Sequence, residues 1–242
     1  MFKIDEIAPD VFRICIYVKE FDLQFNHFLV KDDEPLLYHT GMRGMFPLMH
    51  EAVGKLIDVA ALRWISWSHF EVDECGALNE WLKVAPKAIA ACSQIGAIVN
   101  VADFADRPPR ALTADAPLQT GKHRFTFHAT PHLPHGWDAG ALFEETNGTL
   151  FCSDLFHHNG ECEPLMETED LLERTQKAQV DMQQTPLMDY MPYTPQTQPM
   201  LDRLAALKPK TLAIMHGSSY RGDAGKLLTG LGPVFKSVFG QA

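Results

Sequence analysis

The sequence predicts an α/β protein in which two mixed β-sheets lie between layers of helices. Short runs of β-forming residues alternate with segments whose apolar residues have helical spacing. In the middle of the chain this alternation gives way to consecutive strands separated by turns, which predicts antiparallel pairing. The chain has 242 residues, of which 46% are hydrophobic, so it can bury a substantial core.

The first half of the chain is expected to begin with strands. Phe12–Val18 has the alternating pattern of a strand, and the next two strands, Gln24–Lys31 and Pro35–His39, form a hairpin around the turn-forming residues 32–34. The segments that follow are predicted to be, in order, a helix, a strand, a helix, a strand and a helix: Phe46–Ile57, Arg63–Ser68, Gly76–Val84, Lys87–Cys92 and Ile95–Val101.

The second half is expected to contain an antiparallel section and then a helical one. Arg124–Ala129 and Ala141–Glu145 are predicted strands, and Asn147-Gly148 is a strong hairpin turn before the returning strand Thr149–Ser153. The remaining segments are predicted to be a helix, a loop, a helix and a strand, followed by a last helix near the C-terminus: Glu169–Gln183, Thr185–Pro199, Met200–Leu207 and Thr211–Met215.

Composition predicts a single domain over residues 1–242, in the cytoplasm. No internal repeat or interdomain linker is visible, and too little chain follows the 185–199 loop to form a domain of its own. No apolar stretch approaches the roughly 20 residues of a membrane span, and the acidic N-terminus does not resemble an export signal. The net charge of −10 makes nucleic acid an unexpected partner, and the five cysteines contain no C-x-x-C pair.

Polar residues follow four of the predicted strands. His69 follows Arg63–Ser68, His135 comes shortly after Arg124–Ala129, and two further residues, Asp154 and His216, directly follow later strands. Because ligands collect at the carboxyl ends of strands in α/β sheets, these side chains are expected to converge.

The first of these positions belongs to the pattern His69-x-Glu71-x-Asp73. If this segment is an extended loop, alternate residues point the same way and offer three donors to one side. Imidazoles with carboxylates suit iron or manganese better than a thiolate-seeking cation, and a carboxylate such as Asp154 can bridge two ions. Alone, the triplet is more often a solvated loop, and a histidine after a strand is often structural. Five matches in the right order favour a metal site.

These residues resemble the metallo-β-lactamase superfamily and, within it, the flavodiiron branch. Hydrolases of the superfamily have H-x-H-x-D-H after an early strand. Here the segment is H-F-E-V-D-E, so Glu71 stands where they have a second histidine, an exchange that goes with iron in place of zinc. The segments H-G-W-D-A-G (135–140), C-S-D-L-F (152–156) and M-H-G (215–217) are similar to the flavodiiron segments that contain the later ligands. The resemblance implies an αββα sandwich.

The resemblance also implies a ligand set. The spacings are 62 positions from Asp73 to His135, 19 from there to Asp154 and 62 from there to His216, close to the family pattern. One iron would be held by three residues and the other by two, with Asp154 bridging: His69, Glu71 and His135 for the first iron, Asp73 and His216 for the second. Zinc or manganese are possible substitutes in both positions. His132 is the rival for the third histidine, and it is otherwise expected beside the metals or in the pocket.

Two departures from the flavodiiron pattern bear on function. Residue 74 is Glu where hydrolases and many flavodiiron proteins have a histidine; Glu74 is expected to ligate, to bind through water or to point away. No flavodoxin domain is expected in this chain, so it resembles stand-alone oxygen-binding diiron proteins, whose ending is similar to H-G-S-S-Y at 216–220. His27 and Tyr193, with Tyr190 in the same loop, are candidates for the pocket, although a structural or surface role is at least as plausible for each.

Three functions follow from these expectations. The first is a non-haem diiron protein that binds O2 or NO, for sensing or handling of the gas. The second is an O2 or NO reductase that takes electrons from an external donor, such as a rubredoxin-like or flavodoxin-like protein, and the third is a metal-dependent hydrolase. A redox or signalling protein is the expected partner, and the homodimer of the flavodiiron proteins stays an open alternative.

Overall fold

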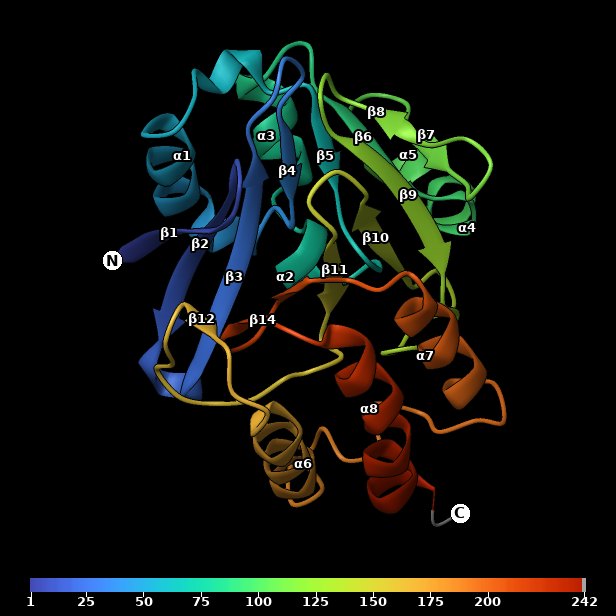
Figure 1. The fold of residues 1–242 in the computed structure, drawn as a ribbon. Helices are drawn as coiled ribbons and strands as arrows, with labels where there is room; N and C mark the ends of the chain where they lie inside the picture. Colours follow the sequence, from blue (N-terminus) through green and yellow to red (C-terminus); the bar gives the residue numbers. More distant parts are fainter. Residues whose placement is uncertain (241–242) are drawn as a thin grey trace.

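The computed structural model describes residues 1–240 as four layers, with two seven-stranded sheets face to face and helices outside them (Figure 1). Both sheets are mixed. In the first sheet, antiparallel pairs are followed by parallel ones. In the second sheet, antiparallel pairs lie on both sides of a parallel pair, β11 with β13. The predicted αββα sandwich is thereby confirmed.

The first sheet has its strands in sequence order, and its β1–β4 half is antiparallel. Its strands are β1 Phe2–Ala8, β2 Val11–Val18, β3 Leu23–Val30, β4 Leu36–Tyr38, β5 Trp64–Ser66, β6 Ile89–Ser93 and β7 Arg110–Leu112. The second sheet has the order β12-β14-β13-β11-β10-β9-β8. Its strands are β8 Leu118–Gln119, β9 Arg124–Ala129, β10 Gly140–Glu144, β11 Thr149–Ser153, β12 Leu165–Met166, β13 Thr211–Ile214 and β14 Ser219–Arg221.

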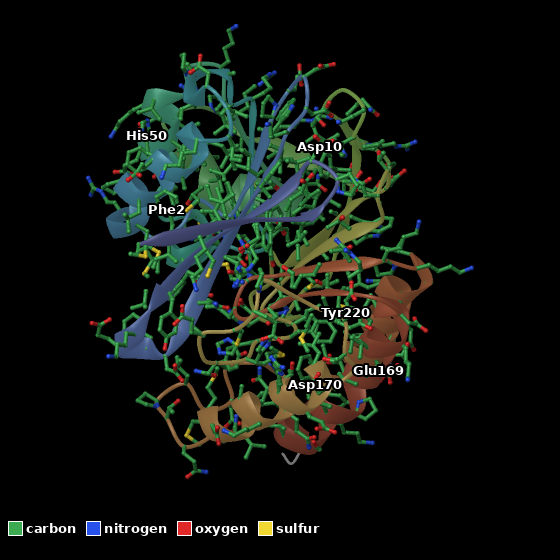
Figure 2. The ribbon with its side chains drawn as sticks, turned by 60° about the vertical axis from the view of Figure 1, so that its left-hand side comes forward. Phe2, Asp10, His50, Glu169, Asp170 and Tyr220 are labelled. Carbon is green, nitrogen blue, oxygen red and sulfur yellow. The ribbon has the colours of Figure 1, made fainter. Side chains whose placement is uncertain are left out.

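The helices divide between the two outer faces, as Figure 1 shows. One apolar cluster joins the first sheet to α1 and α3, a second joins the other sheet to α6, α7 and α8, and a third fills the space between the sheets. In Figure 2, Phe2 and His50 lie in the half of the molecule that contains the first sheet, and Tyr220 and Glu169 lie in the half that contains the second sheet. The α-helices are α1 Phe46–Gly54, α2 Val72–Cys75, α3 Leu78–Val84, α4 Gln94–Gly96, α5 Ala102–Phe104, α6 Leu171–Met182, α7 Thr197–Ala206 and α8 Ala224–Phe239.

Short helical turns complete the chain: 3-10 turns at Lys19–Phe21, Arg43–Met45 and Val59–Ala61, and a π-helical turn at Ala97–Val101 between α4 and α5. Within residues 1–240, no helix combines the length and the hydropathy that crossing a bilayer requires. The predicted strands and long helices are present with end shifts of a few residues. The sequence analysis missed five strands, β1, β7, β8, β12 and β14, of which all but β1 have only two or three residues.

The packing of the two sheets brings the ends of several strands to one edge. The backbone N–H of Asn26 on β3 donates to the carbonyl of Met215 after β13 (2.9 Å), which joins the first sheet to the second. The N–H of Gly140 on β10 donates to the carbonyl of Ser68 after β5 (3.1 Å). The N–H of Met215 in turn donates to the carbonyl of Ser153 at the end of β11 (2.9 Å). The segments after β5, β11 and β13, which contain most of the predicted site residues, are thus fixed to neighbouring strands at this edge.

Candidate metal centre

The segment after β5 turns sharply into α2, so the expectation of an extended loop over 69–73 is wrong. Val72 and Asp73 are already helical, and Glu71, the residue before the helix, is extended, with φ −137° and ψ 155°. The N–H of Cys75 donates to the carbonyl of Glu71 at 2.8 Å, which closes the first turn. Asp73 therefore projects from a helical turn. Because of this turn, Asp73 and Glu71 serve different parts of the site.

Two histidines and two carboxylates form the first group. A carboxylate oxygen of Glu71, Oε2, lies between Nε2 of His69 (2.9 Å) and Nε2 of His135 (2.7 Å). Asp154 Oδ2 is 3.8 Å from the first of these nitrogens and 3.9 Å from the second. One donor atom from each residue falls within 4.8 Å of all the others, which is the spacing that a single bound cation requires.

Asp73 and His216 form the second group, next to the first. Nε2 of His216 is 3.3 Å from Asp73 Oδ2 and 3.3 Å from Asp154 Oδ1. The other ring nitrogen, Nδ1, donates to the carbonyl of Gln24 at 2.9 Å, so the tautomer that leaves Nε2 free to face the carboxylates is fixed. Asp154 thus offers one oxygen to each group and lies between them. All six residues that the sequence predicted as ligands meet here.

The electrostatics of the metal-free site favour cations. Burial lowers the pKa of His69, but the carboxylates of Glu74, Glu71 and Asp154 together raise it to about 10. Burial likewise lowers the pKa of His216, but the hydrogen bond that its ring donates to Asp73 and the charge of Asp154 raise it to about 9. Hydrogen bonds from His135 and His69 hold the pKa of Glu71 well below its ordinary value. Protons on the histidines therefore occupy positions that suit bound cations.

The donor set fits iron. Asp73 Oδ1 and Asp154 Oδ1 are buried without a hydrogen-bond partner among the described residues, which is costly unless an ion accepts their lone pairs. Two imidazoles and one carboxylate on one ion, as in His69, His135 and Glu71, form the donor set of many non-haem ferrous sites. Among residues 1–240 the cysteines are free, and none belongs to the metal-binding cluster, so a thiolate is not in the donor set.

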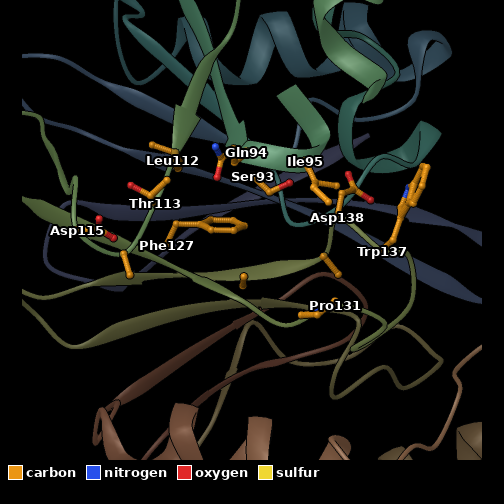
Figure 3. A pocket seen from close by; sticks show the side chains of 13 residues that line it. Ser93, Gln94, Ile95, Leu112, Thr113, Asp115, Phe127, Pro131, Trp137 and Asp138 are labelled. Atoms are coloured by element: carbon orange, nitrogen blue, oxygen red, sulfur yellow. The ribbon is translucent and has the colours of Figure 1, made fainter. Parts of the chain in front are cut away.

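A cavity of about 730 Å³ opens over both groups. Glu71, Asp73, His135, Asp154 and His216 form its floor, together with His157. Its walls are mostly apolar: Phe21, Leu23, Phe25, Met42, Val72, Met182, Leu187 and Tyr190. A second cavity of about 490 Å³ has no lining residue in common with the first. It lies between Thr113, Phe127 and Trp137 and has no histidine in its lining (Figure 3). The first cavity is therefore the candidate ligand pocket.

Residues 23–217 match a protein family that is described as "ODP family beta lactamase". The chain belongs to this family. The match covers the segments that hold the six residues of the site, and it confirms the metallo-β-lactamase resemblance.

The curated proteins that the chain is similar to are named as diflavin flavoproteins. The chain is 27% identical over 149 residues to a protein of Nostoc sp. strain PCC 7120 named diflavin flavoprotein A 1, a region that covers 57% of this chain and 26% of the relative. It is 28% identical over 161 residues to diflavin flavoprotein A 3 of the same organism (63% and 27%). The chain thus spans about a quarter of the curated relatives that it matches.

Solved structures share the fold. Rubredoxin oxygen:oxidoreductase from Desulfovibrio gigas aligns with a TM-score of 0.78 and 16% identity, over 97% of this chain and 62% of that chain. The flavodiiron core of Flv1 from Synechocystis sp. PCC6803 gives 0.78 and 19%, over 97% and 61%. A fragment of diflavin flavoprotein A 5 from Nostoc sp. PCC 7120 gives 0.79 and 17%, over 98% and 96%. At these identities the likeness establishes the fold, and the predicted flavodiiron resemblance is confirmed at that level.

Of the three roles that the sequence analysis left open for Glu74, the structure shows the one in which it points away. Its buried carboxylate turns away from the cavity and accepts the backbone N–H groups of Ser68 (2.8 Å) and His69 (2.9 Å) and the hydroxyl of Ser153. It also lies 3.4 Å from Nδ1 of His69 and 3.4 Å from Nε2 of His39. Glu74 therefore holds the segment before Glu71 in place instead of facing the metal positions.

The remaining candidates for the pocket lie in different places. His132 is exposed, and a backbone bond from its N–H to the carbonyl of Gly136 (2.7 Å) turns the loop so that His135 faces the site instead. Tyr193 packs on the core of the second sheet; Tyr190 lines the cavity, with its ring 5.3 Å from that of His135. His27 is fully buried outside the lining of the cavity. Loop conformation decides these positions, and spacing along the chain does not reveal it.

Proposed function

We propose that this ODP-family chain holds two iron ions and binds O2 or NO at them. His69, Glu71 and His135 would hold one ion, and Asp73 and His216 the other, with Asp154 between them. Ferrous ions with open coordination positions supply electrons and binding sites for O2 or NO. The apolar walls of the cavity would admit a small uncharged gas and would limit the access of water to the buried donors.

One observation favours iron over the zinc of a hydrolase. The carboxylate of Glu71 is 2.9 Å and 2.7 Å from the two histidine nitrogens of the first group, at the position where hydrolases of the superfamily have a third imidazole. An anionic oxygen donor stabilises a harder cation and a higher charge than an imidazole does. The donor set therefore supports redox chemistry at this ion in preference to zinc-dependent hydrolysis.

Tyr190 is positioned to act on the bound gas. Its ring lines the cavity 5.3 Å from that of His135, and its hydroxyl accepts a hydrogen bond from Gln179 Nε2 at 3.1 Å. Burial raises the pKa of this phenol, so the hydroxyl keeps its proton at neutral pH. A neutral phenol at the edge of an apolar cavity can donate a hydrogen bond to a polarised diatomic ligand.

Gas binding is the first proposal and reduction by an external donor is the second. The Desulfovibrio gigas structure is named as a rubredoxin oxygen:oxidoreductase, so a rubredoxin-like donor is the corresponding partner for this chain. The acidic net charge of −10 would steer a basic face of such a donor. The free cysteines of the described residues fit a reducing compartment such as the cytoplasm. Pairing of two copies is compatible with both functions.

The test is metal content followed by gas exposure. The chain is purified without added metal, its iron, zinc and manganese are measured, and it is reduced anaerobically before O2 or NO is admitted. We expect about two irons per chain and a new visible absorption band with either gas. Slow decay of that band without turnover indicates a binder, and sustained gas consumption with reduced rubredoxin indicates a reductase. Two zinc ions and no spectral response would contradict the proposal.

Glu71→His provides the matched variant. It restores the imidazole of the hydrolases at the same position, and it is expected to shift the metal content from iron toward zinc under identical growth conditions. Glu71→Gln removes the charge and keeps the shape, so it separates the effect of charge from that of geometry. Unchanged iron content in both variants would remove Glu71 as the basis for the metal preference.

A further inference from the structure

The two halves of the metal centre are unequal in protein donors. The first group has His69, His135 and Glu71 in addition to the shared Asp154. The second has only His216 and Asp73 in addition to Asp154, because the next residue along the chain is Glu74 and its carboxylate points to the backbone. The second position therefore lacks the two-imidazole, one-carboxylate set that the first position has.

His157 is the side chain that completes this set. It is buried, it lines the same cavity as Asp73 and His216, and its Nε2 has no hydrogen-bond partner among the described residues. Its ring centroid is 4.9 Å from that of His216. In the first group the rings of His69 and His135, which share one cluster, are 4.3 Å apart. The two histidine pairs are thus similarly spaced, one pair on each side of Asp154.

The backbone brings His157 to this place. After β11 the chain turns, and the N–H of His157 donates to the carbonyl of Asp154 at 3.0 Å, so that the bridging residue and His157 belong to the same turn. The N–H of the next residue, His158, donates to the carbonyl of His216 at 3.2 Å. This bond fixes the turn against the segment that holds His216.

The neighbouring histidine has a different, structural role. His158 Nδ1 donates to the carbonyl of Phe156 (2.9 Å) and its Nε2 accepts the N–H of Ser218 (2.9 Å), so both ring nitrogens are occupied. Gly217, at φ +109°, makes room for this ring, since a Cβ there would lie 2.3 Å from Cε1 of His158. His158 anchors the turn, and only His157 has a nitrogen left for a ligand.

We propose that His157 is a protein ligand of the second metal ion and takes the place of the histidine that this chain lacks at position 74. The inference rests on the proposed dinuclear site. With it, each ion has two imidazoles and one terminal carboxylate, and Asp154 lies between them. His27 is the alternative: both its ring nitrogens are buried without a partner among residues 1–240, but it lies outside the cavity lining, beside Gly41.

Metal binding, not gas chemistry, tests this proposal. Anaerobic titration of the metal-free chain with Co²⁺, followed by visible absorption, counts the ions and gives the affinity of each. We expect two ions in the wild type. His157→Gln should leave the first affinity unchanged and weaken the second by at least about 100-fold, beyond the 10–100-fold effect of losing a residue that only orients a ligand. The unchanged first affinity also shows that the variant is folded.

Two controls identify the residue. His27→Gln, a matched loss of another buried histidine with free nitrogens, should bind both ions as the wild type does. In His157→Gly, added imidazole should restore the second ion, which a purely structural role of His157 would not allow. In the Co²⁺-loaded wild type, NMR should show four paramagnetically shifted imidazole N–H resonances, from His69, His135, His157 and His216.

The outcomes separate the two proposals. Two ions in both the wild type and His157→Gln, with equal affinities, would overturn the role of His157 and leave the dinuclear site intact. Loss of the second ion in His27→Gln alone would assign the ligand to His27 and also overturn it. A wild type that binds fewer than two ions would overturn the proposed dinuclear function itself.

Discussion

Loading the metal centre is expected to release about two protons per chain at pH 7. In the metal-free protein the pKa of His69 is about 10 and that of His216 about 9, because neighbouring carboxylates outweigh the effect of burial. Both rings are therefore protonated at pH 7, and both must lose a proton from Nε2 before that nitrogen can bind an ion. The apparent affinity for the pair of ions should then rise by about two powers of ten for each pH unit between 7 and 9.

Isothermal titration of Co²⁺ in buffers with different ionisation enthalpies measures this release directly. The slope of the observed enthalpy against the buffer's ionisation enthalpy gives the number of protons, and it should fall toward zero above pH 10 as both rings deprotonate. His69→Ala should lower the release by one proton as well as weakening the first ion. A slope near zero at pH 7 would show that the carboxylates do not raise the pKa of these histidines, and the electrostatic account of the site would be wrong.

Three further predictions follow from the same contacts. The raised pKa values of His69 and His216 stabilise the metal-free fold. This stabilisation is complete below the pKa of an unfolded histidine, about 6.5, and is lost as the pH rises through about 9 to 10. The Tm of the metal-free protein should therefore fall over this range, while the Tm of the metal-loaded protein should not. Glu74→Ala leaves three buried donors without a partner, at a cost of about 1–3 kcal/mol each. Chemical denaturation should therefore show that its free energy of unfolding is lower by at least about 3 kcal/mol. Glu74→Gln keeps an acceptor and should lose less than half as much. Gly217→Ala should lower the free energy of unfolding by about 1–3 kcal/mol from its backbone conformation alone, and it should weaken the binding of the second metal ion by displacing His158. In Gly44→Ala the added Cβ meets nothing within 4 Å, so the free energy of unfolding and the metal affinity should both stay unchanged.

Much of the fold was predictable because the longer strands bury their apolar residues in a regular pattern, either at alternate positions or in a continuous run. Arg124–Ala129 and Thr149–Ser153 have the bounds that the sequence predicted. The strands that the sequence analysis missed lack such a run. β1 is an edge strand with partly exposed residues over most of its length, and β12 has two residues, so their pairing depends on neighbours that only the tertiary structure provides.

The six predicted donors of the site were accessible to sequence reasoning because each lies on a segment that follows a strand, and strand ends meet at one edge. The choice among the three roles of Glu74 was not accessible. A glutamate after H-x-E-x-D is compatible with a ligand, with binding through water or with a side chain that points away, and its partners Ser68 and Ser153 come from two different sheets. His157 was missed for a related reason, since two adjacent histidines give no indication of which one the backbone turn leaves free.

Charge balance explains why a carboxylate can occupy position 74 without facing the metals. Glu71, Asp73, Glu74 and Asp154 place four acidic side chains around the centre, and Glu74 Oε1 lies 3.4 Å from Nδ1 of the ligand candidate His69. In the metal-free protein, the protons on His69 and His216 offset part of this charge. Two divalent cations would replace those protons and balance four carboxylates, which a buried site of low dielectric strongly favours. A neutral histidine at position 74 would leave one positive charge to be balanced by a bound anion. Glu74 thus contributes charge beside His69 without facing either metal position, and the bond that the second ion lacks is the one that we assign to His157.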